Sequence, residues 1–294
     1  TPSFGDSRHT VAAGYDLLTE TFNQAYGLPF NSTDLKSRSA HSLVLEYRGT
    51  FADQLNLSAA VRHDINDSFA DFTTYSLSGA WDLPGTETTL HASVGTGAKN
   101  PTFYEQFGYS LSYVGNPHLL PETSLGWDIG VRQSFFDEMM SLDVTYFAQD
   151  LENKISAGTT GSVTTPVNIA GISTRQGIEV SAMLDLFNGF TASASYNYTD
   201  AQDPTGAREV RRPMHAGVVN LAYAFEDIPL RLNSELVMVG EALDAGKVLP
   251  EYSILNAGLN YQVNDNLEVY GRVHNLFDTS YQTAAGYNNP GRTF

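Results

Sequence analysis

The chain between residues 124 and 150 alternates between apolar and polar positions, with one short break. The apolar positions are Leu125, Trp127, Ile129 and Val131 before the break, and Leu142, Val144, Tyr146 and Ala148 after it. A period of two is typical of extended strands with one apolar and one polar face. Each run of about ten residues, at ~3.3 Å per residue and a tilt near 45°, covers roughly 23 Å, close to the ~25 Å apolar band of an outer-membrane barrel. The break at Asp137-Glu138 predicts a turn, so this segment is interpreted as a membrane-crossing hairpin.

The same alternation recurs along most of the chain. It predicts about thirteen strands, at about 8–20, 38–50, 54–64, 70–83, 86–98, 122–135, 139–157, 166–187, 189–200, 211–225, 229–240, 252–263 and 267–277, with the start of one more at 291–294. No apolar stripe with the 3.6-residue helical period competes with it. The pattern therefore predicts an all-β chain of antiparallel strands.

Short and long connections alternate between these strands. Short turns are expected near 51–54, 83–86, 136–138, 188–189, 226–228 and 264–266, and longer connections at 20–37, 98–122, 158–166, 200–210, 241–251 and 278–290. Asn188-Gly189 predicts a type I′ turn, whose two central residues both need a positive φ. Strict alternation is typical of an up-and-down transmembrane β-barrel, with periplasmic turns at one rim and extracellular loops at the other.

Aromatic residues gather beside the short turns. They are Phe51, Trp81, Phe135, Phe136, Phe187, Phe190, Phe225 and Tyr261. Rings concentrated at one rim are typical of the interfacial girdle of a membrane barrel. Aromatics are common in any strand, but a soluble sheet gives no reason for so many at one rim.

Composition supports a membrane sheet and excludes other classes. Charged residues make up 17% of the chain and aromatic residues 12%, which is a low and a high share, respectively, for a soluble domain. No segment approaches the ~20 apolar residues of a transmembrane helix. The net charge of −17 argues against a nucleic-acid partner, and the absence of cysteine removes disulfides, cysteine metal sites and thiol catalysis.

Several motifs resemble those of TonB-dependent outer-membrane receptors. The matching segments are Gly97–Glu105, Gly115-Asn116-Pro117 with Leu120–Ser124 and Trp127, Asn168–Glu179, Arg211–His215, and Asn275–Asp278 followed by Tyr281 and Pro290-Gly291-Arg292. The resemblance covers almost the whole chain and is nearest to the cobalamin-receptor branch. It implies a 22-stranded barrel filled by an N-terminal plug domain.

The expected fold follows from this resemblance. Residues 1–294 are expected to be the C-terminal portion of the β-barrel, about 13–14 strands of the 22, with the plug domain and the first strands absent. No plug-like segment and no energy-coupling box occurs near Thr1, and the last strand stops at Phe294.

The resemblance also implies a function. The chain would serve energy-coupled uptake of a bulky scarce nutrient, either cobalamin or a siderophore-type metal chelate, across the outer membrane of a Gram-negative bacterium. Its partners would be the nutrient chelate, outer-membrane lipid, and an inner-membrane energy-coupling protein that acts through the plug. The alternative is a passive porin-like channel with a water-filled pore, which the sequence upstream of Thr1 would distinguish.

Two sets of residues are candidates for roles in binding and passage. The aromatic loop after residue 97 predicts a ligand-binding set, Phe103, Tyr104, Phe107, Tyr109, Tyr113 and Asn116, since rings offer broad, stiff contact area. The alternative is that these rings pack the loop against the rim or lie at the lipid interface. The polar strand faces predict a lumen-facing set, Asp128, Arg132, Asp143, Glu179, Asp185, Arg272 and His274. His215 is expected to face the lumen as well.

No catalytic, metal or cofactor site is predicted. None of the seven histidines lies two to four residues from another, and no G-x-S-x-G elbow or Gly-rich phosphate loop occurs. Asp64, Asp67 and Asp71 suggest calcium, but Phe69 and Tyr75 stand where an EF-hand has Gly and Glu, so a solvated loop is favoured. A heme receptor of this family would carry a histidine between Pro101 and Asn116, and none is present.

Overall fold

A computed structural model describes residues 3–4, 7–23, 35–108, 110, 112–186 and 188–294. Its elements are almost all strands, with a single short helix among the described residues. The strands of the large sheet are β1 (Ser3–Phe4), β2 (Ser7–Phe22), β3 (Lys36–Phe51), β4 (Leu55–Asn66), β5 (Phe72–Asp82), β6 (Thr88–Lys99), β7 (Glu122–Phe135), β8 (Met140–Glu152), β11 (Ile172–Asp185), β12 (Phe190–Gln202), β13 (His215–Ala224), β14 (Leu230–Val239), β17 (Tyr252–Asn264) and β18 (Leu267–Val273). The connections contain α1 (Phe103–Phe107) and the hairpins β9 (Ile155–Thr160) with β10 (Val163–Asn168) and β15 (Ala242–Asp244) with β16 (Lys247–Leu249).

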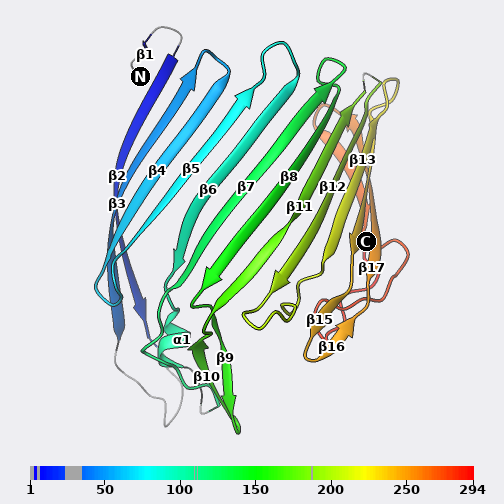
Figure 1. The fold of residues 1–294 in the computed structure, drawn as a ribbon. Coiled ribbons are helices and arrows are strands. Elements are labelled where there is room, and N and C mark those ends of the chain that lie inside the picture. Colours follow the sequence, from blue (N-terminus) through cyan, green and yellow to red (C-terminus); the bar gives the residue numbers. More distant parts are fainter. Residues whose placement is uncertain (1–2, 5–6, 24–34, 109, 111, 187) are drawn as a thin grey trace. The chain divides into compact units, whose positions relative to one another are not determined.

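The large sheet has fourteen strands, and each pairs with the next one along the chain once the two small hairpins are left out. The chain forms two compact units. Unit 1 comprises residues 1–81, 92–128 and 149–174, and unit 2 comprises residues 82–91, 129–148 and 175–294. Within each unit, Figure 1 shows short turns at one end of the strands and the long connections at the other. This confirms the predicted antiparallel, all-β order.

In unit 1 the strand register separates an apolar face from a polar face. Rows such as Ala13, Leu45, Val61 and Tyr75 lie side by side on β2 to β5 and are apolar. The band of such rows extends from Phe51 to His41 on β3, about ten residues, which corresponds to ~23 Å at a 45° tilt. The height predicted from the alternation of the chain is therefore present in the folded sheet.

Unit 2 shows the same separation. Phe190, Tyr223, Leu232, Leu259 and Gly271 form one apolar row across β12 to β18. Residues one position along, such as Asn233 and Arg272, belong to the polar face.

Two short turns contain positive φ angles. Gly189 has a φ of 78°, and Leu186 N donates to Phe190 O over 2.9 Å across the same turn. Phe187 lies outside the described residues, so the type I′ turn expected at Asn188-Gly189 stays a prediction. Consecutive positive φ angles, 49° and 52°, occur at Ala52-Asp53, where Gln54 N donates to Phe51 O.

Two predicted strands, 139–157 and 166–187, are too long. The hairpin β9–β10 lies between β8 and β11 and overlaps both predictions. Its strand β9 comprises residues 155–160, and its strand β10 comprises residues 163–168. The helix α1 and the hairpin β15–β16 also lie within predicted loops. In the part of the chain that the structure describes, no helix has the length and apolar character to cross a membrane.

Candidate functional site

The long connection after β6 begins with α1, and its ends are fixed by local chemistry. Thr102 Oγ1 accepts from Glu105 N over 3.2 Å, and Glu105 Oε2 accepts from Thr102 N over 2.7 Å. This reciprocal capping satisfies backbone donors that a five-residue helix cannot satisfy internally. At the other end Gly108, with a φ of 70°, donates its N–H to Tyr104 O. The helix is thus a defined element despite its length.

Arg38 on β3 attaches α1 to the sheet. Its Nη1 donates to Pro101 O over 2.7 Å and to Gln106 Oε1 over 3.3 Å, and its Nε pairs with Glu20 Oε2 over 2.7 Å. Pro101 and Gln106 are buried. Charge-assisted hydrogen bonds to buried acceptors are the strong kind, so this arginine is the main polar anchor of the loop.

Aromatic rings surround the same arginine. The guanidinium Cζ of Arg38 lies 4.4 Å from the ring centroid of Phe103, and the ring of Phe22 stacks on the ring of Phe103 with centroids 5.4 Å apart. Lys36 Nζ lies 5.5 Å from the centroid of Phe107. Tyr104 and Phe107 remain exposed, at 54% and 40%. The result is a cluster of rings and cations, formed by Phe22, Lys36, Arg38, Phe103, Tyr104 and Phe107, at the long-loop end of unit 1.

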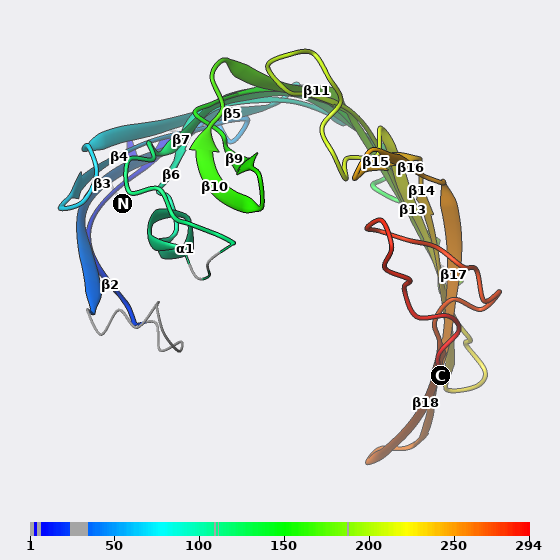
Figure 2. The same cartoon turned by 90° about the horizontal axis from the view of Figure 1, so that it is seen from below.

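The second half of the loop joins the next long connection. Val114 N donates to Thr164 O over 2.9 Å, and Thr164 N donates to Ser112 O over 2.8 Å. Asn116 Nδ2 donates to Pro166 O over 3.1 Å. The loop therefore adds main-chain pairing to the hairpin β9–β10. Figure 2 shows α1 and this hairpin on the same side of the unit 1 strands.

These contacts separate the members of the predicted ligand-binding set. The ring of Phe103 packs on Phe22 and Arg38, and the side chain of Asn116 is engaged at Pro166 O and at His118 N. Both residues therefore have the packing role that was the alternative interpretation. The rings of Tyr104 and Phe107 are exposed, so these two residues remain candidates for ligand binding.

The two remaining members of the set are tyrosines. Tyr113 is half-buried and forms bridges with Ser110 and Thr164. Tyr109 lies outside the described residues.

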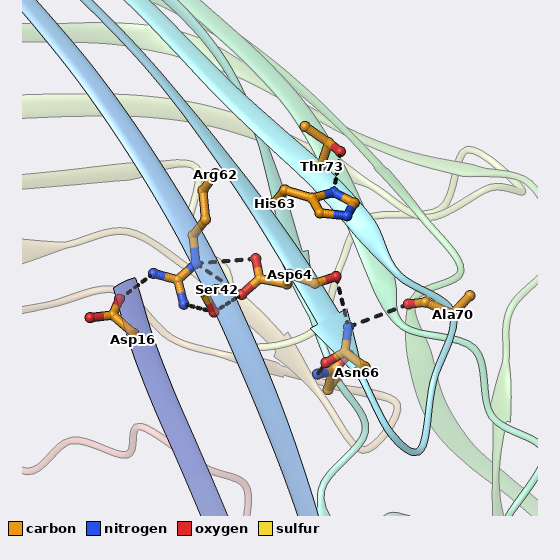
Figure 3. Close-up of polar contacts among 9 residues, drawn as sticks. Asp16, Ser42, Arg62, His63, Asp64, Asn66, Ala70 and Thr73 are labelled. Atoms are coloured by element: carbon orange, nitrogen blue, oxygen red, sulfur yellow. Dashed lines mark hydrogen bonds and ion pairs between the residues drawn. The ribbon is translucent and has the colours of Figure 1, made fainter. Parts of the chain in front are cut away.

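The polar face of unit 1 contains a charged network that the sequence analysis did not identify (Figure 3). Arg62 Nη1 pairs with Asp16 Oδ2 over 2.9 Å, and its Nε pairs with Asp64 Oδ1 over 3.0 Å. Ser42 Oγ donates to Asp64 Oδ1 and accepts from Arg62 Nη2 over 2.6 Å. The network joins β2, β3 and β4, and Asp64 and Ser42 are buried in it. The sequence signal for this network is polar residues at positions that face each other on neighbouring strands. Such positions can be recognised only when the strand register is known.

Four of the predicted lumen-facing residues are on the polar face of the central strands and have polar partners. Asp143 accepts from Arg132 Nε and lies 3.2 Å from His91 Nε2, while Thr145 Oγ1 donates to it over 2.9 Å. Asp128 accepts from Ser93 Oγ. Glu179 accepts from Asn197 Nδ2 over 2.9 Å.

The other three, Asp185, Arg272 and His274, line a cavity of about 790 Å³ on the polar face of unit 2. Its lining also includes asparagine and serine residues, among them Asn233 and Asn256. That all seven residues face a lumen remains a prediction.

His215 is on the other face, so the expectation that it faces the lumen is wrong. It pairs with Tyr198, and its Nδ1 lies 2.7 Å from the hydroxyl of Tyr196. Gly217, Val219 and the other residues in step with it belong to the apolar face. The prediction rested on the polarity of histidine alone, whereas the alternation of side chains along β13 places the imidazole on the apolar face.

Buried carboxylates organise the long connections of unit 2. Glu209 accepts from Arg175 Nη2 over 3.1 Å. Asp244 pairs with Arg211 Nε over 3.0 Å and accepts from Ala285 N over 2.7 Å. The hydrogen bond from Ala285 N and then the one from Arg211 hold the pKa of Asp244 below its ordinary value. Three separate connections are joined in this way.

The possible calcium loop has other contacts. Asp67 accepts from Ser68 Oγ and Ser39 N, which lower the pKa of its carboxyl, and Asp71 accepts from Asn66 N. Asp64 is committed to the Arg62 network. Among the described residues no group of three or more His, Asp or Glu side chains is arranged to hold a metal ion.

Curated relatives resemble the chain over most of its length. The vitamin B12 transporter BtuB of Photobacterium profundum is 29% identical over 249 residues, covering 80% of this chain and 39% of the relative. BtuB of Vibrio vulnificus (strain YJ016) is 28% identical over 283 residues, covering 94% and 44%. An iron-regulated outer membrane virulence protein of Vibrio cholerae serotype O1 is 26% identical, covering 97% and 48%. The chain thus spans less than half the length of these relatives.

Solved structures share the fold. A mutant of the ferric enterobactin receptor of Pseudomonas aeruginosa in complex with enterobactin has a TM-score of 0.82 at 22% identity, covering 99% of this chain and 51% of the receptor. The siderophore receptor PirA of Acinetobacter baumannii has a TM-score of 0.80 at 19% identity, covering 97% and 51%. None of these similarities supports the porin-like alternative.

The family described as TonB dependent receptor-like, beta-barrel matches residues 1–276. This match covers nearly the whole sheet, and the strand order and alternating faces agree with it. The chain is located in the outer membrane of a Gram-negative bacterium, as the resemblance predicted. It belongs to the TonB-dependent receptor family, as part of the β-barrel.

Proposed function

We propose that the chain serves energy-coupled uptake of a bulky nutrient chelate, cobalamin or a siderophore complex, as part of an outer-membrane receptor. The family match over residues 1–276 carries this proposal. The names of the relatives, which include vitamin B12 transporters and siderophore receptors, indicate the class of cargo. No bond is made or broken, so the mechanism is binding followed by gated passage. Energy would come from an inner-membrane protein acting through a plug domain.

The ring and cation cluster of unit 1 is the proposed site of first contact. It lies at the long-loop end, which is extracellular in barrels of this kind, so a ligand from outside meets it before the lumen. Tyr104 and Phe107 expose ring surface there, and burial contributes ~25 cal/mol per Å². Lys36 supplies positive charge beside Phe107. Such a surface suits a bulky chelate that has both apolar and anionic parts.

Ligand titration on the purified full-length receptor tests this site. The probes are vitamin B12 and ferric enterobactin. The double variant Tyr104→Ala with Phe107→Ala is tested with whichever probe the wild-type receptor binds. Its affinity for that probe is expected to be weaker by at least ~1 kcal/mol, about fivefold. The matched control is Phe136→Ala, which removes an exposed ring at the short-turn end.

Folding is checked by heat-modified mobility on electrophoresis gels. An unchanged affinity in a folded double variant would leave the rings with a packing role only. Binding of neither probe by the folded wild-type receptor would contradict the proposed cargo class.

We also propose that residues 1–294 form the C-terminal portion of the receptor barrel. The match covers only 39% of the relative from Photobacterium profundum and 51% of the ferric enterobactin receptor, which supports this proposal. The sheet supports it as well, because among the described strands β18 pairs only with β17. An open sheet edge in lipid leaves unpaired backbone groups that cost several kcal/mol each. Expressed alone, residues 1–294 are therefore expected to aggregate. A protease-resistant, heat-modifiable monomer of these residues in outer membranes would contradict the proposal.

A further inference from the structure

The cavity on the polar face of unit 2 lies near the short-turn end of its strands. Its volume is about 790 Å³, and its lining includes Arg231 and Arg272. Arg231 is the second residue of β14, and Arg272 lies on β18, which begins at Leu267 directly after a short turn. Short turns are periplasmic in barrels of this kind. A ligand that has passed the long loops would therefore reach this cavity late in its passage.

The strand register places the two arginines on either side of β17. Arg231 pairs with Asn260 of β17, and Arg272 pairs with Gly258, two residues away on the same strand. Two strand spacings of ~4.8 Å and two residues of ~3.3 Å separate their backbones by roughly 12 Å. Gly258 makes room between them, since a Cβ there would lie only 2.7 Å from Asn233 Oδ1. Two long side chains at this separation can reach one ligand.

These two guanidinium groups lack a carboxylate partner. On the polar face of unit 1, by contrast, Arg48 pairs with Glu46 over 2.6 Å. Among the residues that the structure describes, Arg231 forms no side-chain hydrogen bond or ion pair. Arg272 lies over the ring of Tyr270, with its Cζ 5.3 Å from the ring centroid, and has no ion pair within the same residues. Both positive charges are therefore available to a ligand.

Carboxylates in the same lining restrict the ligand. They are Asp185, Glu235 and Glu268. Asn256 Nδ2 donates to Glu235 Oε1 over 2.8 Å, and Asn260 Nδ2 donates to Glu268 Oε1, so each bond engages one oxygen and the other can accept from a ligand. Three carboxylates repel a ligand with several negative charges. A ligand with one anionic group and several N–H donors is complementary to this wall.

We propose that this cavity is a second contact site for the cargo, used as the cargo leaves the barrel. The proposal rests on the proposed uptake function and deepens it by selecting one class of cargo. That class is a bulky molecule with one phosphodiester and several amide groups, as in cobalamin, rather than a ferric siderophore with several negative charges. The phosphodiester would pair with Arg231 and Arg272, and amide N–H groups would donate to Glu235 and Glu268. The ring of Tyr270, 66% exposed beside Arg272, would contact apolar surface of the cargo.

The test is uptake of radiolabelled vitamin B12 by cells that carry the full-length receptor. The double variant Arg231→Gln with Arg272→Gln is expected to lower the initial uptake rate about tenfold, since it removes two charge-assisted contacts. The affinity of the purified receptor for vitamin B12 is expected to stay unchanged, because first contact is made at the long-loop end. Arg231→Lys with Arg272→Lys keeps both charges and is expected to retain most of the wild-type rate.

Arg48→Gln is the matched control. Arg48 also lies on a polar face close to a short turn, but it already has Glu46 as its partner. This variant is expected to take up vitamin B12 at the wild-type rate, and heat-modified mobility confirms that each variant is folded. Unchanged uptake in the double glutamine variant, equal loss in the glutamine and lysine variants, or equal loss in Arg48→Gln would each overturn the proposal.

Two further outcomes separate this proposal from its neighbours. If the arginines hold another part of the receptor instead of the cargo, the double glutamine variant should become leaky and sensitise cells to vancomycin, and this result would overturn the proposal. Wild-type uptake of ferric enterobactin but not of vitamin B12 would keep the uptake function and overturn only the assignment of this cavity. Wild-type uptake of neither probe would overturn both.

Discussion

The long connections of unit 1 and unit 2 are held in place by different forces. In unit 1 the loop after β6 is fixed by main-chain pairing with β10 and by rings stacked around one arginine, Arg38. In unit 2 the connections are fixed by ion pairs on two buried carboxylates, Glu209 and Asp244. The comparison indicates that unit 1 presents a preorganised apolar surface, whereas unit 2 presents a charge-dependent one.

This difference has a functional consequence. Stacked rings and backbone pairs do not titrate, and Arg38 donates to the neutral acceptors Pro101 O and Gln106 Oε1, so salt screens these contacts of the ring and cation cluster less than it screens a pair of opposite charges. The ion pair of Arg38 with Glu20 is the exception in this cluster. Ion pairs at half-exposed arginines weaken as salt screens them. The surface proposed for first ligand contact thus belongs to the unit whose loops are less sensitive to the medium.

The largest expected effect tests whether the apolar face of unit 2 faces lipid. Ile129 is 57% exposed on the apolar face of β7. Arginine there should cost ~2–4 kcal/mol at the bilayer midplane and block assembly of the full-length receptor in the outer membrane. Assembly is measured by heat-modified mobility and protease resistance of membrane fractions.

The control for Ile129→Arg is Ser181→Arg, on the exposed polar face of β11. The inward neighbour Gly130 is unsuitable, because side chains of His91 and Thr145 already occupy the place of its Cβ. Equal assembly of the two arginine variants would show that the faces are assigned wrongly.

A second change removes the anchor of unit 1. Arg38→Ala leaves the buried Pro101 carbonyl and the Gln106 side chain without their charged donor. The α1 segment is expected to lose about 2–3 kcal/mol of local stability, while the barrel remains assembled. Hydrogen exchange at residues 102–108 measures the loss.

Arg8→Ala is the control for Arg38→Ala, because its pair with Asp53 is exposed on both sides and should contribute little. If the exchange of α1 amides is the same in the two variants, the loop is held by ring stacking and backbone pairing rather than by this arginine.

The sequence predicts an element of this fold well when the interactions that determine it lie within one short segment. The bounds of β7 agree with the predicted strand 122–135, because alternation and a turn signal are both contained in the segment. The hairpin β9–β10 was missed, since residues 155–157 and 166–168 continue the alternation of the two adjacent predicted strands and residues 158–166 were assigned to the connection between them. The contacts of Arg38 with Glu20 and Pro101 depend on register across a long connection, which one sequence does not supply.

The site was predictable to a similar extent. Its ring-rich loop was recognised from composition, but the separation of Phe103 from Tyr104 depends on which face of a five-residue helix meets β2 and β3. His215 shows the opposite error, because the type of residue was given more weight than the alternation of its strand. Periodicity was therefore the more reliable guide than polarity.

The smallest expected effect is a pH dependence of the Asp244 contacts in unit 2 that the main-chain pairing of the unit 1 loop does not share. The pKa of Asp244 is lowered by the N–H of Ala285 and by Arg211. A depressed pKa means that the carboxylate stabilises the fold at pH above its unfolded value of 3.8, and that this contribution is lost as the pH falls through the lower, folded value. Protection of the Ala285 amide from hydrogen exchange, corrected for the intrinsic rate, should therefore decrease below pH 3.8. The amide of Val114 in unit 1, which donates to the main-chain oxygen of Thr164, should keep its protection over the same range. In Asp244→Asn the side-chain oxygen still accepts from Ala285, but it no longer titrates, so the protection should be lower at neutral pH and independent of pH. A parallel decrease at Val114, or a pH dependence that persists in the asparagine variant, would show that the two units do not differ in the way their contacts indicate.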